Sequence, residues 1–192
     1  MMSDRETNNR ETYDVTIGGV ERKLPKIEVA PGVKIALLNI LGDVEFVNAA
    51  VEGLADKLDL EAFDVIVTAE AKSIPLAHKL AERTNKPYVV LRKTAKPYMG
   101  KTVWAETNSI TTDQPQTLFL DEKDHALIDG KRVLLVDDVV STGSTQQGMK
   151  TVMEKAGATV VAESAIFTEG NDPAKWQHII ALGNLPLFFE SE

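Results

Sequence analysis

The sequence predicts an α/β domain with a mostly parallel sheet flanked by helices. Short apolar runs at 64–69, 87–91 and 133–136 lack regular polar alternation, which is typical of strands buried on both faces. Segments with apolar residues at helical spacing lie between these runs. This alternation of strand and helix predicts parallel strands joined by right-handed crossovers.

The composition indicates one soluble domain. The chain has 192 residues, of which 43% are hydrophobic and 26% charged, enough for a sizeable core. Its net charge of −8 argues against broad binding to nucleic acid or anionic membranes. The absence of cysteine excludes disulfides, thiol catalysis and cysteine-ligated metals. No apolar run is long enough to span a membrane, and the polar start is no signal peptide. We therefore expect a cytoplasmic protein that has neither nucleic acid nor membrane as a partner.

The amino-terminal part is expected to lie outside the strand–helix pattern. Residues 1–12 are polar, and we expect them to be disordered, whereas 13–192 are expected to form a single domain. Apolar and polar residues alternate on both sides of two glycines, which predicts a β-hairpin over 13–30. Pro25 and the pair Pro31 and Gly32 interrupt this segment, and 33–38 is a candidate short strand.

Helix signals mark three later segments. Asp43 is a candidate N-cap for a helix whose apolar stripe continues to Leu58. A second helix, over 75–83, has a proline in its first turn. A third contains Met149 and Val152 and is closed by Gly157. A strand is expected over 159–167, and the apolar tail after it is expected to pack on the core or on a partner chain.

Residues 93–117 are expected to form a long flexible loop. They are polar, contain several lysines and threonines, and have only brief apolar pieces. A connection of this length inside a compact domain is typically functional or mobile. The segment 117–120 and the strand after the turn at Asp129 and Gly130 are expected to form a hairpin at the sheet edge.

The stretch 133–145 carries the strongest functional signal. Asp137 and Asp138 directly follow the apolar run, at the predicted carboxyl end of its strand, where open α/β sheets bind ligands. The loop after them, Ser141, Thr142, Gly143, Ser144 and Thr145, offers hydroxyls and free backbone N–H groups at a helix N-terminus, which favour an anion. A phosphate site beside two carboxylates suggests a phosphorylated sugar whose hydroxyls the carboxylates hold. The carboxylates can also order a metal ion through water.

Two other kinds of site have a similar sequence pattern. A solvated acidic turn before a capped helix would need no second acid after a fully apolar strand. A phospho-acceptor receiver domain also places two acids after a strand, but it needs several further strand–helix units, and too few residues follow Asp138 for them.

The letters VLLVDDVVSTGST resemble the phosphoribosyl pyrophosphate (PRPP) motif of the type I phosphoribosyltransferases. In that family an apolar strand leads into two acids and a small-residue loop with Thr-Gly-x-Thr. The resemblance implies that Asp137 and Asp138 hold the ribose hydroxyls and, through water, a Mg²⁺ cofactor. It implies that Ser141, Thr142, Gly143, Ser144 and Thr145 hold the 5′-phosphate. The similarity covers roughly residues 30–168.

Two further segments agree with this resemblance. The letters TAEAKS at 68–73 are similar to the pyrophosphate loop of adenine phosphoribosyltransferases, which has Glu-Ala-Arg-Gly there. This chain keeps the charge but has serine for glycine, which reduces backbone freedom. An Arg-Lys pair follows the equivalent strand in the adenine enzymes and in similar archaeal purine enzymes. The residues implied in pyrophosphate binding are Glu70, Ala71, Lys72, Ser73, Arg92 and Lys93. The alternatives are a surface ion pair for Glu70 and Lys72, and a solvated strand end for Arg92 and Lys93.

The polar segment 93–117 stands where this family has a flexible catalytic hood. The resemblance makes Lys96, Lys101 and Glu106 its candidate catalytic residues. The adenine enzymes have Glu-Tyr-Gly in the hood, whereas Thr107 and Asn108 follow Glu106 here, and a solvated Glu106 is the alternative. Tyr98 and Trp104 are candidates for stacking on a base or for anchoring the loop.

The resemblance implies a purine phosphoribosyltransferase, which transfers the phosphoribosyl group of PRPP to a purine and releases pyrophosphate. It further implies purine salvage and a homodimer. Adenine is favoured, because hypoxanthine–guanine enzymes of the well-known type carry an aspartate where Ser141 stands. Hypoxanthine, guanine and xanthine remain alternatives. So does a PRPP-binding transcriptional regulator without catalysis, although the first 30 residues show no helix-turn-helix pattern.

Overall fold

The computed structural model describes residues 11–107 and 116–189. The disorder expected for residues 1–10 lies outside the described residues. Glu11 and Thr12, which were also expected to be disordered, are described. Thr12 begins strand β1 (Thr12–Ile17), and the Glu11 carbonyl accepts a hydrogen bond of 2.8 Å from the Lys26 amide.

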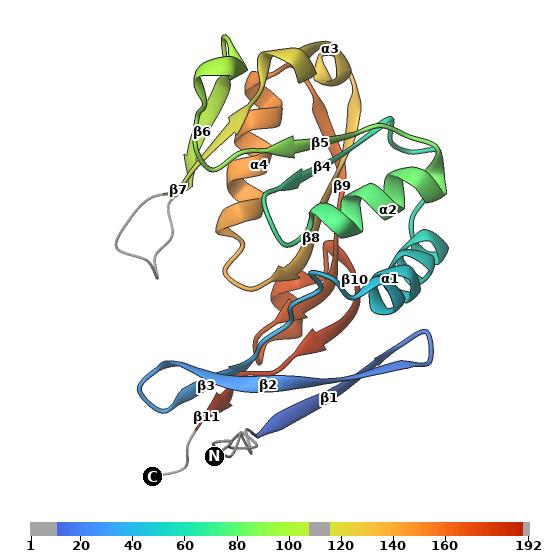
Figure 1. The fold of residues 1–192 in the computed structure, drawn as a ribbon, viewed down its shortest axis with the longest axis vertical. Coiled ribbons are helices and arrows are strands. Elements are labelled where there is room, and N and C mark those ends of the chain that lie inside the picture. Colours follow the sequence, from blue (N-terminus) through green and yellow to red (C-terminus); the bar gives the residue numbers. More distant parts are fainter. Residues whose placement is uncertain (1–10, 108–115, 190–192) are drawn as a thin grey trace, which may run out of the picture.

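A parallel sheet forms the centre of the part of the chain that the structure describes (Figure 1). Its five strands lie in the order β10-β9-β8-β4-β5, and each adjacent pair is parallel. This confirms the predicted fold class. The strands are β4 (Val65–Ala69), β5 (Tyr88–Leu91), β8 (Arg132–Val140), β9 (Thr159–Glu169) and β10 (Ile179–Leu185). The tail packs on the core as expected, with Trp176, Ile179 and Leu185 buried. It also supplies β10, an edge strand that was not predicted.

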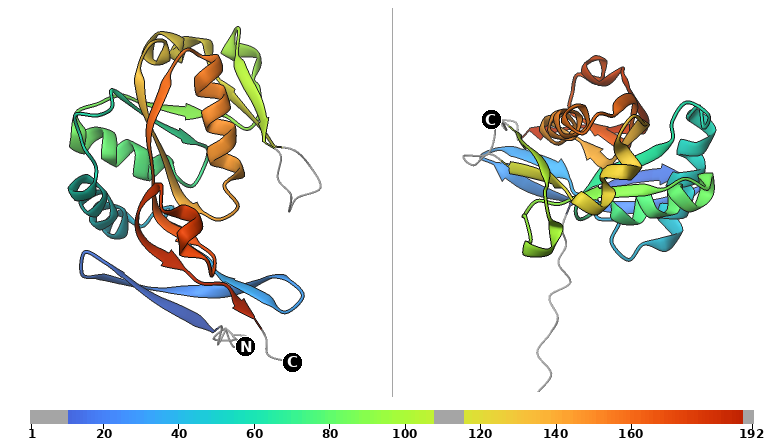
Figure 2. Two further views of the ribbon diagram at one scale, coloured as in Figure 1. Left: turned by 180° about the vertical axis from the view of Figure 1, so that it is seen from behind. Right: turned by 90° about the horizontal axis from the view of Figure 1, so that it is seen from above.

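Helices cover both faces of this sheet. Helices α1 (Val44–Lys57) and α2 (Ile74–Thr84) pack on one face, and α4 (Ser144–Lys155) packs on the other, as the view from behind shows (Figure 2). Successive residues of β8 alternate between the two cores. Leu134 and Val136 join the α1–α2 side, whereas Val133 and Leu135 join the α4 side. A strand buried on both faces explains why its sequence is continuously apolar.

The predicted helix boundaries hold within a few residues. The Asp43 side chain accepts a hydrogen bond of 3.2 Å from the Phe46 amide and so caps α1. Pro75 lies in the first turn of α2. Gly157 follows the last residues of α4 with φ +82°, a conformation that glycine adopts without a steric cost.

The predicted amino-terminal hairpin is part of a larger antiparallel sheet. The hairpin consists of β1 and β2 (Val20–Ala30). Strands β3 (Val33–Ala36) and β11 (Phe188–Phe189) extend it in the order β1-β2-β3-β11. Pro25 was expected to interrupt this segment, and that expectation is wrong. Its carbonyl accepts from the Leu37 amide at 2.9 Å, just past the end of β3. The N–H that proline lacks therefore falls where the β2–β3 ladder ends.

The hairpin expected between 117–120 and the strand after Asp129 is also wrong. Strand β7 (Gln116–Leu120) pairs instead with β6 (Val103–Thr107). The physical reason is that β8 already has β4 on one side and β9 on the other, so it has no free edge. Between β7 and β8 lie the 3₁₀ turn η2 (Glu122–Asp124) and the short helix α3 (His125–Ile128). Two further 3₁₀ turns are η1 (Pro97–Met99) and η3 (Pro173–Trp176).

Candidate active site

The two acids lie within β8 and not after it. The strand continues to Val140 because β9 runs beside it, with Val139 opposite Phe167 and Val140 opposite Thr168. The expectation that the acids end the strand is thus wrong by two residues. Asp138 is buried at 9% exposure, and Asp137 is partly exposed. Residues before and after the acid pair are thus paired with β9, and this pairing fixes the backbone of the two acids.

Asp137 makes three internal hydrogen bonds. Its Oδ1 accepts from the Ser73 hydroxyl at 2.7 Å and from the Asp138 amide at 2.9 Å. Its Oδ2 accepts from the Gln146 side-chain amide of α4 at 2.8 Å. Loss of hydration around its carboxyl group, together with the negative charge of Asp138, raises the pKa of Asp137 to about 7. Asp137 is therefore tied to α2 and α4 as well as to its own strand.

Ser73 brings the predicted pyrophosphate loop against the acid pair. It stands at the N-cap position of α2, but its side chain caps no helix amide and is buried at 2% exposure. The hydroxyl instead contacts Asp137, accepts from the Asp138 amide at 3.0 Å, and lies 3.1 Å from Asp138 Oδ1. A second bond, of 2.7 Å, joins the Thr68 hydroxyl to the Val136 carbonyl. Two segments that are distant in sequence thus form one site.

Of the remaining loop residues, Glu70 is bonded to the neighbouring strand end, whereas Ala71 and Lys72 are exposed. Glu70 turns back and accepts from Arg92 Nε at 2.7 Å and from the Lys93 amide at 2.6 Å. Partial burial opposes ionisation of Glu70, but these two donors prevail and lower its pKa. Ala71 and Lys72 are exposed, and the peptide bond between Glu70 and Ala71 is cis. Glu70 is therefore paired with Arg92, which also shows that Arg92 is not a simply solvated strand end.

The base of the predicted hood is an ordered hairpin. Ala105 and Thr107 of β6 are buried at 2% and 4% exposure, against the α4 side of the sheet. At Gly148 of α4 the two elements approach so closely that a β-carbon would lie 2.1 Å from Thr107 Cγ2. Glu106 points to the exposed side of β6, opposite Thr117. The part of the predicted flexible loop at 108–115 lies outside the described residues.

The other hood candidates are exposed. Lys96 and Lys101 flank η1, and the Lys101 amide donates to Glu122 Oε2 at 2.9 Å. The Tyr98 hydroxyl lies 3.5 Å from Arg92 Nη1, and the Trp104 ring lies under the ammonium of Lys155 at 5.3 Å. Within the described ranges, no hydrogen bond joins Lys96, Lys101 or Glu106 to the acid pair.

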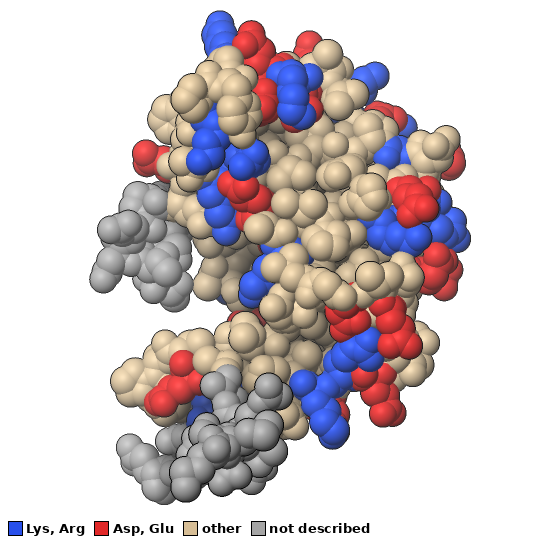
Figure 3. Space-filling model, in the orientation of Figure 1, with Lys and Arg blue, Asp and Glu red and all other residues tan. Residues whose placement is uncertain are grey.

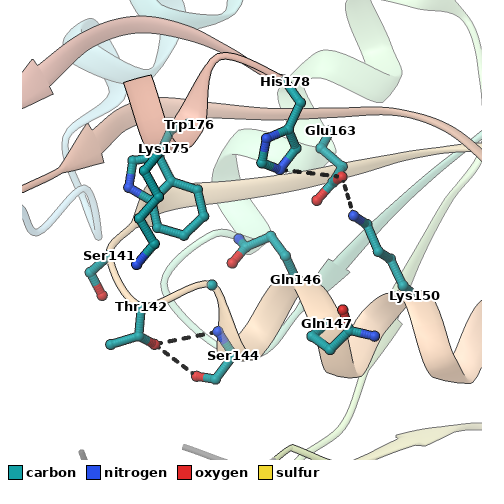
Figure 4. A pocket seen from close by; sticks show the side chains of 11 residues that line it. Ser141, Thr142, Ser144, Gln146, Gln147, Lys150, Glu163, Lys175, Trp176 and His178 are labelled. Atoms are coloured by element: carbon teal, nitrogen blue, oxygen red, sulfur yellow. Dashed lines mark hydrogen bonds and ion pairs between the residues drawn. The ribbon is translucent and has the colours of Figure 1, made fainter. Parts of the chain in front are cut away.

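A pocket of about 660 Å³ opens beside the predicted phosphate loop (Figure 4). The Thr142 and Ser144 hydroxyls lie 3.0 Å apart at its floor, and the Ser144 amide donates to Thr142 Oγ1 at 3.3 Å. Trp176 of η3 covers the loop at Gly143, and Lys175 lies 4.5 Å from its ring centre. At the far end, Lys150 and Glu163 form an ion pair with His178 beside them.

Trp176 is the site residue that sequence reasoning missed. It was noticed only as part of an apolar tail. The signal available was an aromatic residue shortly after the strand that neighbours β8, because the carboxyl ends of adjacent parallel strands meet at one edge of a sheet.

Comparisons with known proteins agree with this architecture. An adenine phosphoribosyltransferase of Thermoanaerobacter pseudethanolicus has a similar structure, with a TM-score of 0.63, 23% identity, and 91% of this chain and 95% of that chain covered. The fold is thus that of the type I phosphoribosyltransferases. The chain belongs to the phosphoribosyl transferase domain family, which it matches over residues 41–182.

Curated relatives have several different names. An adenine phosphoribosyltransferase of Thermosipho africanus is 32% identical over 148 residues, which are 74% of this chain and 84% of the relative. A hypoxanthine/guanine phosphoribosyltransferase of Methanotorris igneus is 38% identical over 104 residues, 54% and 53% of the two chains. The purine repressor PurR of Bacillus subtilis is 30% identical over 145 residues, 75% and 50% of the two chains. The matches thus span about half the length of the latter two relatives.

None of the helices in the described part of the chain is long and apolar enough to cross a membrane. Among residues 11–107 and 116–189, no group of three or more His, Asp or Glu side chains is placed to hold a metal ion.

Proposed function

We propose that this chain is a purine phosphoribosyltransferase that serves purine salvage. It would transfer the phosphoribosyl group of PRPP to N9 of a purine and release pyrophosphate. The observation that carries the proposal is the hydrogen-bonded contact of Ser73 with Asp137 and Asp138. This contact joins a loop suited to pyrophosphate to an acid pair suited to ribose, with a phosphate loop next in the chain.

The 5′-phosphate binds at the loop 141–145. Ser141 and Thr142 are exposed, and the loop leads directly into the N-terminus of α4. Backbone N–H groups and the helix dipole favour a dianion at such a position. The ribose hydroxyls then lie over the acid pair, where Asp138 has the less occupied carboxylate, because three donors already engage Asp137.

Pyrophosphate binds on the side of β4 and β5. Lys72 and Lys93 are exposed there, next to the paired Glu70 and Arg92. Basic side chains gather on the surface over the connection between β5 and β6 (Figure 3). Cations at this place lower the energy of the departing pyrophosphate charge more than that of bound PRPP, which is the requirement for catalysis.

The acid pair fits Mg²⁺ chemically. Magnesium is usually held by one or two carboxylates together with substrate phosphate oxygens, and two adjacent carboxylates are what this site offers. Asp137 and Asp138 would hold it through water. When bound, Mg²⁺ neutralises charge on pyrophosphate.

The transfer needs no protein nucleophile. The bond from ribose C1 to a pyrophosphate oxygen breaks, the pyrophosphate leaves with the electron pair, a bond from C1 to purine N9 forms, and the N9 proton passes to solvent. The chain contributes orientation of both reactants and cations for the leaving group. Lys96, Lys101 and Glu106 are proposed to act from the hood when it covers the site.

Adenine is the proposed acceptor. Ser141 offers no carboxylate to a 6-oxopurine, and Trp176 gives the base an aromatic face beside the phosphate loop. Hypoxanthine, guanine and xanthine are the alternatives. A homodimer is also proposed, and sedimentation equilibrium tests it.

A PRPP-binding regulator without catalysis is the second candidate. Its support is the 30% identity to the purine repressor PurR of Bacillus subtilis. Both candidates need the same PRPP site, so only turnover separates them.

The test is pyrophosphate release with PRPP, Mg²⁺ and a panel of adenine, hypoxanthine, guanine, xanthine and uracil, beside calorimetric titration with PRPP. Release with adenine above all others supports the proposal. Release with another base moves the acceptor to that base. Tight PRPP binding without release with any base supports the regulator. Neither binding nor release overturns both candidates.

A further inference from the structure

The Ser73 hydroxyl makes several close polar contacts that are not part of any helix or strand hydrogen-bond pattern. It lies 2.7 Å from Asp137 Oδ1, 3.0 Å from the Asp138 amide nitrogen and 3.1 Å from Asp138 Oδ1. Ser73 belongs to the loop after β4, whereas both acids belong to β8. The hydroxyl therefore connects two strands at the edge where ligands enter.

The Ser73 hydroxyl has only one proton for the two carboxylate oxygens beside it. A serine hydroxyl has a single proton to donate, and the shorter contact is the one to Asp137. The same oxygen accepts from the Asp138 amide. The contact with Asp138 Oδ1, at 3.1 Å, is the longer and therefore the weaker of the two contacts that this proton can serve. The arrangement satisfies Asp137 and leaves the Asp138 carboxylate available to another donor.

Gln146 completes the hold on Asp137. Its side chain is buried at 6% exposure and donates to Asp137 Oδ2 at 2.8 Å. Ser73 comes from the start of α2 and Gln146 from the first turns of α4, so the carboxylate is fixed from both faces of the sheet. A side chain held from two sides keeps its rotamer, and this preorganises the neighbouring residue.

Capping of helix α2 does not account for the serine at position 73. Serine at an N-cap normally accepts from an amide in the first helical turn, but Ser73 makes no such bond. Its 2% exposure also removes it from direct contact with bulk solvent. The hydroxyl is thus used entirely on the acid pair.

We infer that Ser73 is a positioning residue, which fixes Asp137 and ties the pyrophosphate loop to β8 so that Asp138 faces the ribose of PRPP. The inference rests on the proposed function. Ser73 itself does not touch the reacting atoms. Its loss loosens the acid pair and the loop together, which weakens PRPP binding and leaves the purine site unaffected.

The experiment compares Ser73→Ala and Ser73→Gly with the unchanged chain. A hydrogen bond to a charged group is lost in both, so we expect the KM for PRPP and the calorimetric Kd for PRPP to rise about tenfold. The KM for the purine stays unchanged and kcat changes by less than about threefold, because binding and not chemistry is affected. Ser73→Thr, which keeps the hydroxyl, restores both PRPP constants.

Ser164→Ala is the matched control. Ser164 is a serine of β9 buried at 2% exposure, and its hydroxyl has no partner among the described residues. The control removes a buried hydroxyl but no contact to the acids, so PRPP binding stays at the original value. Thermal melting of each variant shows whether it folds.

The outcomes separate the two proposals. Unchanged PRPP constants in Ser73→Ala and Ser73→Gly overturn the inference while the enzyme stands. A fall in kcat with unchanged KM for both substrates also overturns it, because PRPP binding is then unaffected by the loss of the hydroxyl. If the original chain binds PRPP without turnover, the proposed reaction fails and the Kd values still decide the role of Ser73. If the original chain binds no PRPP, both fail.

Discussion

The Trp176 ring lies directly against Gly143, with Cη2 only 2.7 Å from the position that a β-carbon on Gly143 would occupy. Gly143 also has φ +85°, which side-chain-bearing residues rarely adopt. The conformation of the loop 141–145 therefore depends on the contact with Trp176 of η3 as well as on its own backbone.

Gly143→Ala is expected to weaken binding of PRPP strongly. The new methyl group must displace either Trp176 or the loop, and the positive φ adds about 1 kcal/mol of strain. We expect PRPP affinity to fall at least tenfold by titration calorimetry. Gly32→Ala is the control, because Gly32 also has a positive φ, of +72°, but no atoms near its β-carbon position and no part in the site. Equal loss in both variants would show that the effect comes from general destabilisation of the chain and not from the phosphate loop.

Asp138→Asn is expected to raise the KM for PRPP or to abolish turnover while the chain stays folded. The neutral amide lacks the charge that we propose to hold the ribose hydroxyls and Mg²⁺. Steady-state kinetics with PRPP as the varied substrate, together with a melting curve, measures both effects. Unaltered kinetics would remove Asp138 from the ribose site.

Asp137→Asn is expected to stabilise the fold at alkaline pH. The folded pKa of about 7 lies above the ordinary value of about 3.9 in the unfolded chain. Between these two values the folded state binds more protons, so stability falls as pH rises from about 4 to about 7 and stays low above. Asparagine cannot ionise, and Gln146 can rotate its amide to present an oxygen to it. At pH 8 we expect a gain of roughly 1–3 kcal/mol in the free energy of unfolding.

Denaturant unfolding at pH 5 and pH 8 measures this difference. Asp56→Asn, at an exposed position of α1, is the matched control and should change stability little at either pH. A loss of stability at pH 8 in Asp137→Asn would contradict the burial argument.

Arg92→Ala is expected to impair pyrophosphate binding. Its guanidinium holds Glu70 at 2.7 Å and thereby the shape of the loop that follows β4. Pyrophosphorolysis of the nucleotide product, run with pyrophosphate as the varied substrate, should show a KM at least tenfold higher. Arg83→Ala removes a comparable ion pair, with Glu52, at an exposed place between α1 and α2 and should leave this KM unchanged.

Gly148→Ala is expected to destabilise the hairpin of β6 and β7. Its β-carbon would lie 2.1 Å from Thr107 Cγ2, so α4 and β6 must separate. Overpacking of this kind costs about 1–3 kcal/mol. The double variant with Thr107→Ser, which deletes that methyl group, should recover most of the loss. A double-mutant cycle from denaturant unfolding supplies the coupling energy, and additive effects would argue against the contact.

Local patterns were sufficient for most of the central sheet and its helices. The continuous apolar runs of β4, β5 and β8 and the Asp43 cap of α1 are properties of short segments. Strands β10 and β11 escaped prediction because Gly183 lies inside β10 and because β11 has only two residues. Their strand character comes from pairing with β9 and β3.

The site was predictable in parts but not as a whole. The segments 70–73 and 137–145 were each found from the sequence. The contact between them joins Ser73 and Asp137, 64 residues apart, and no local pattern encodes it. Ser73 was assigned to pyrophosphate binding, with a loss of backbone freedom relative to glycine, whereas its hydroxyl faces the acids. Trp176 was missed for the same reason, because its contact with Gly143 exists only in the folded chain.

The pairing of β11 with β3 limits the order in which the two sheets can form during synthesis. The antiparallel sheet that contains the first described strands takes its final member from residues near 189. During synthesis the strands β4, β5, β8 and β9 emerge well before that member. The central sheet can therefore assemble while its antiparallel neighbour still lacks an edge.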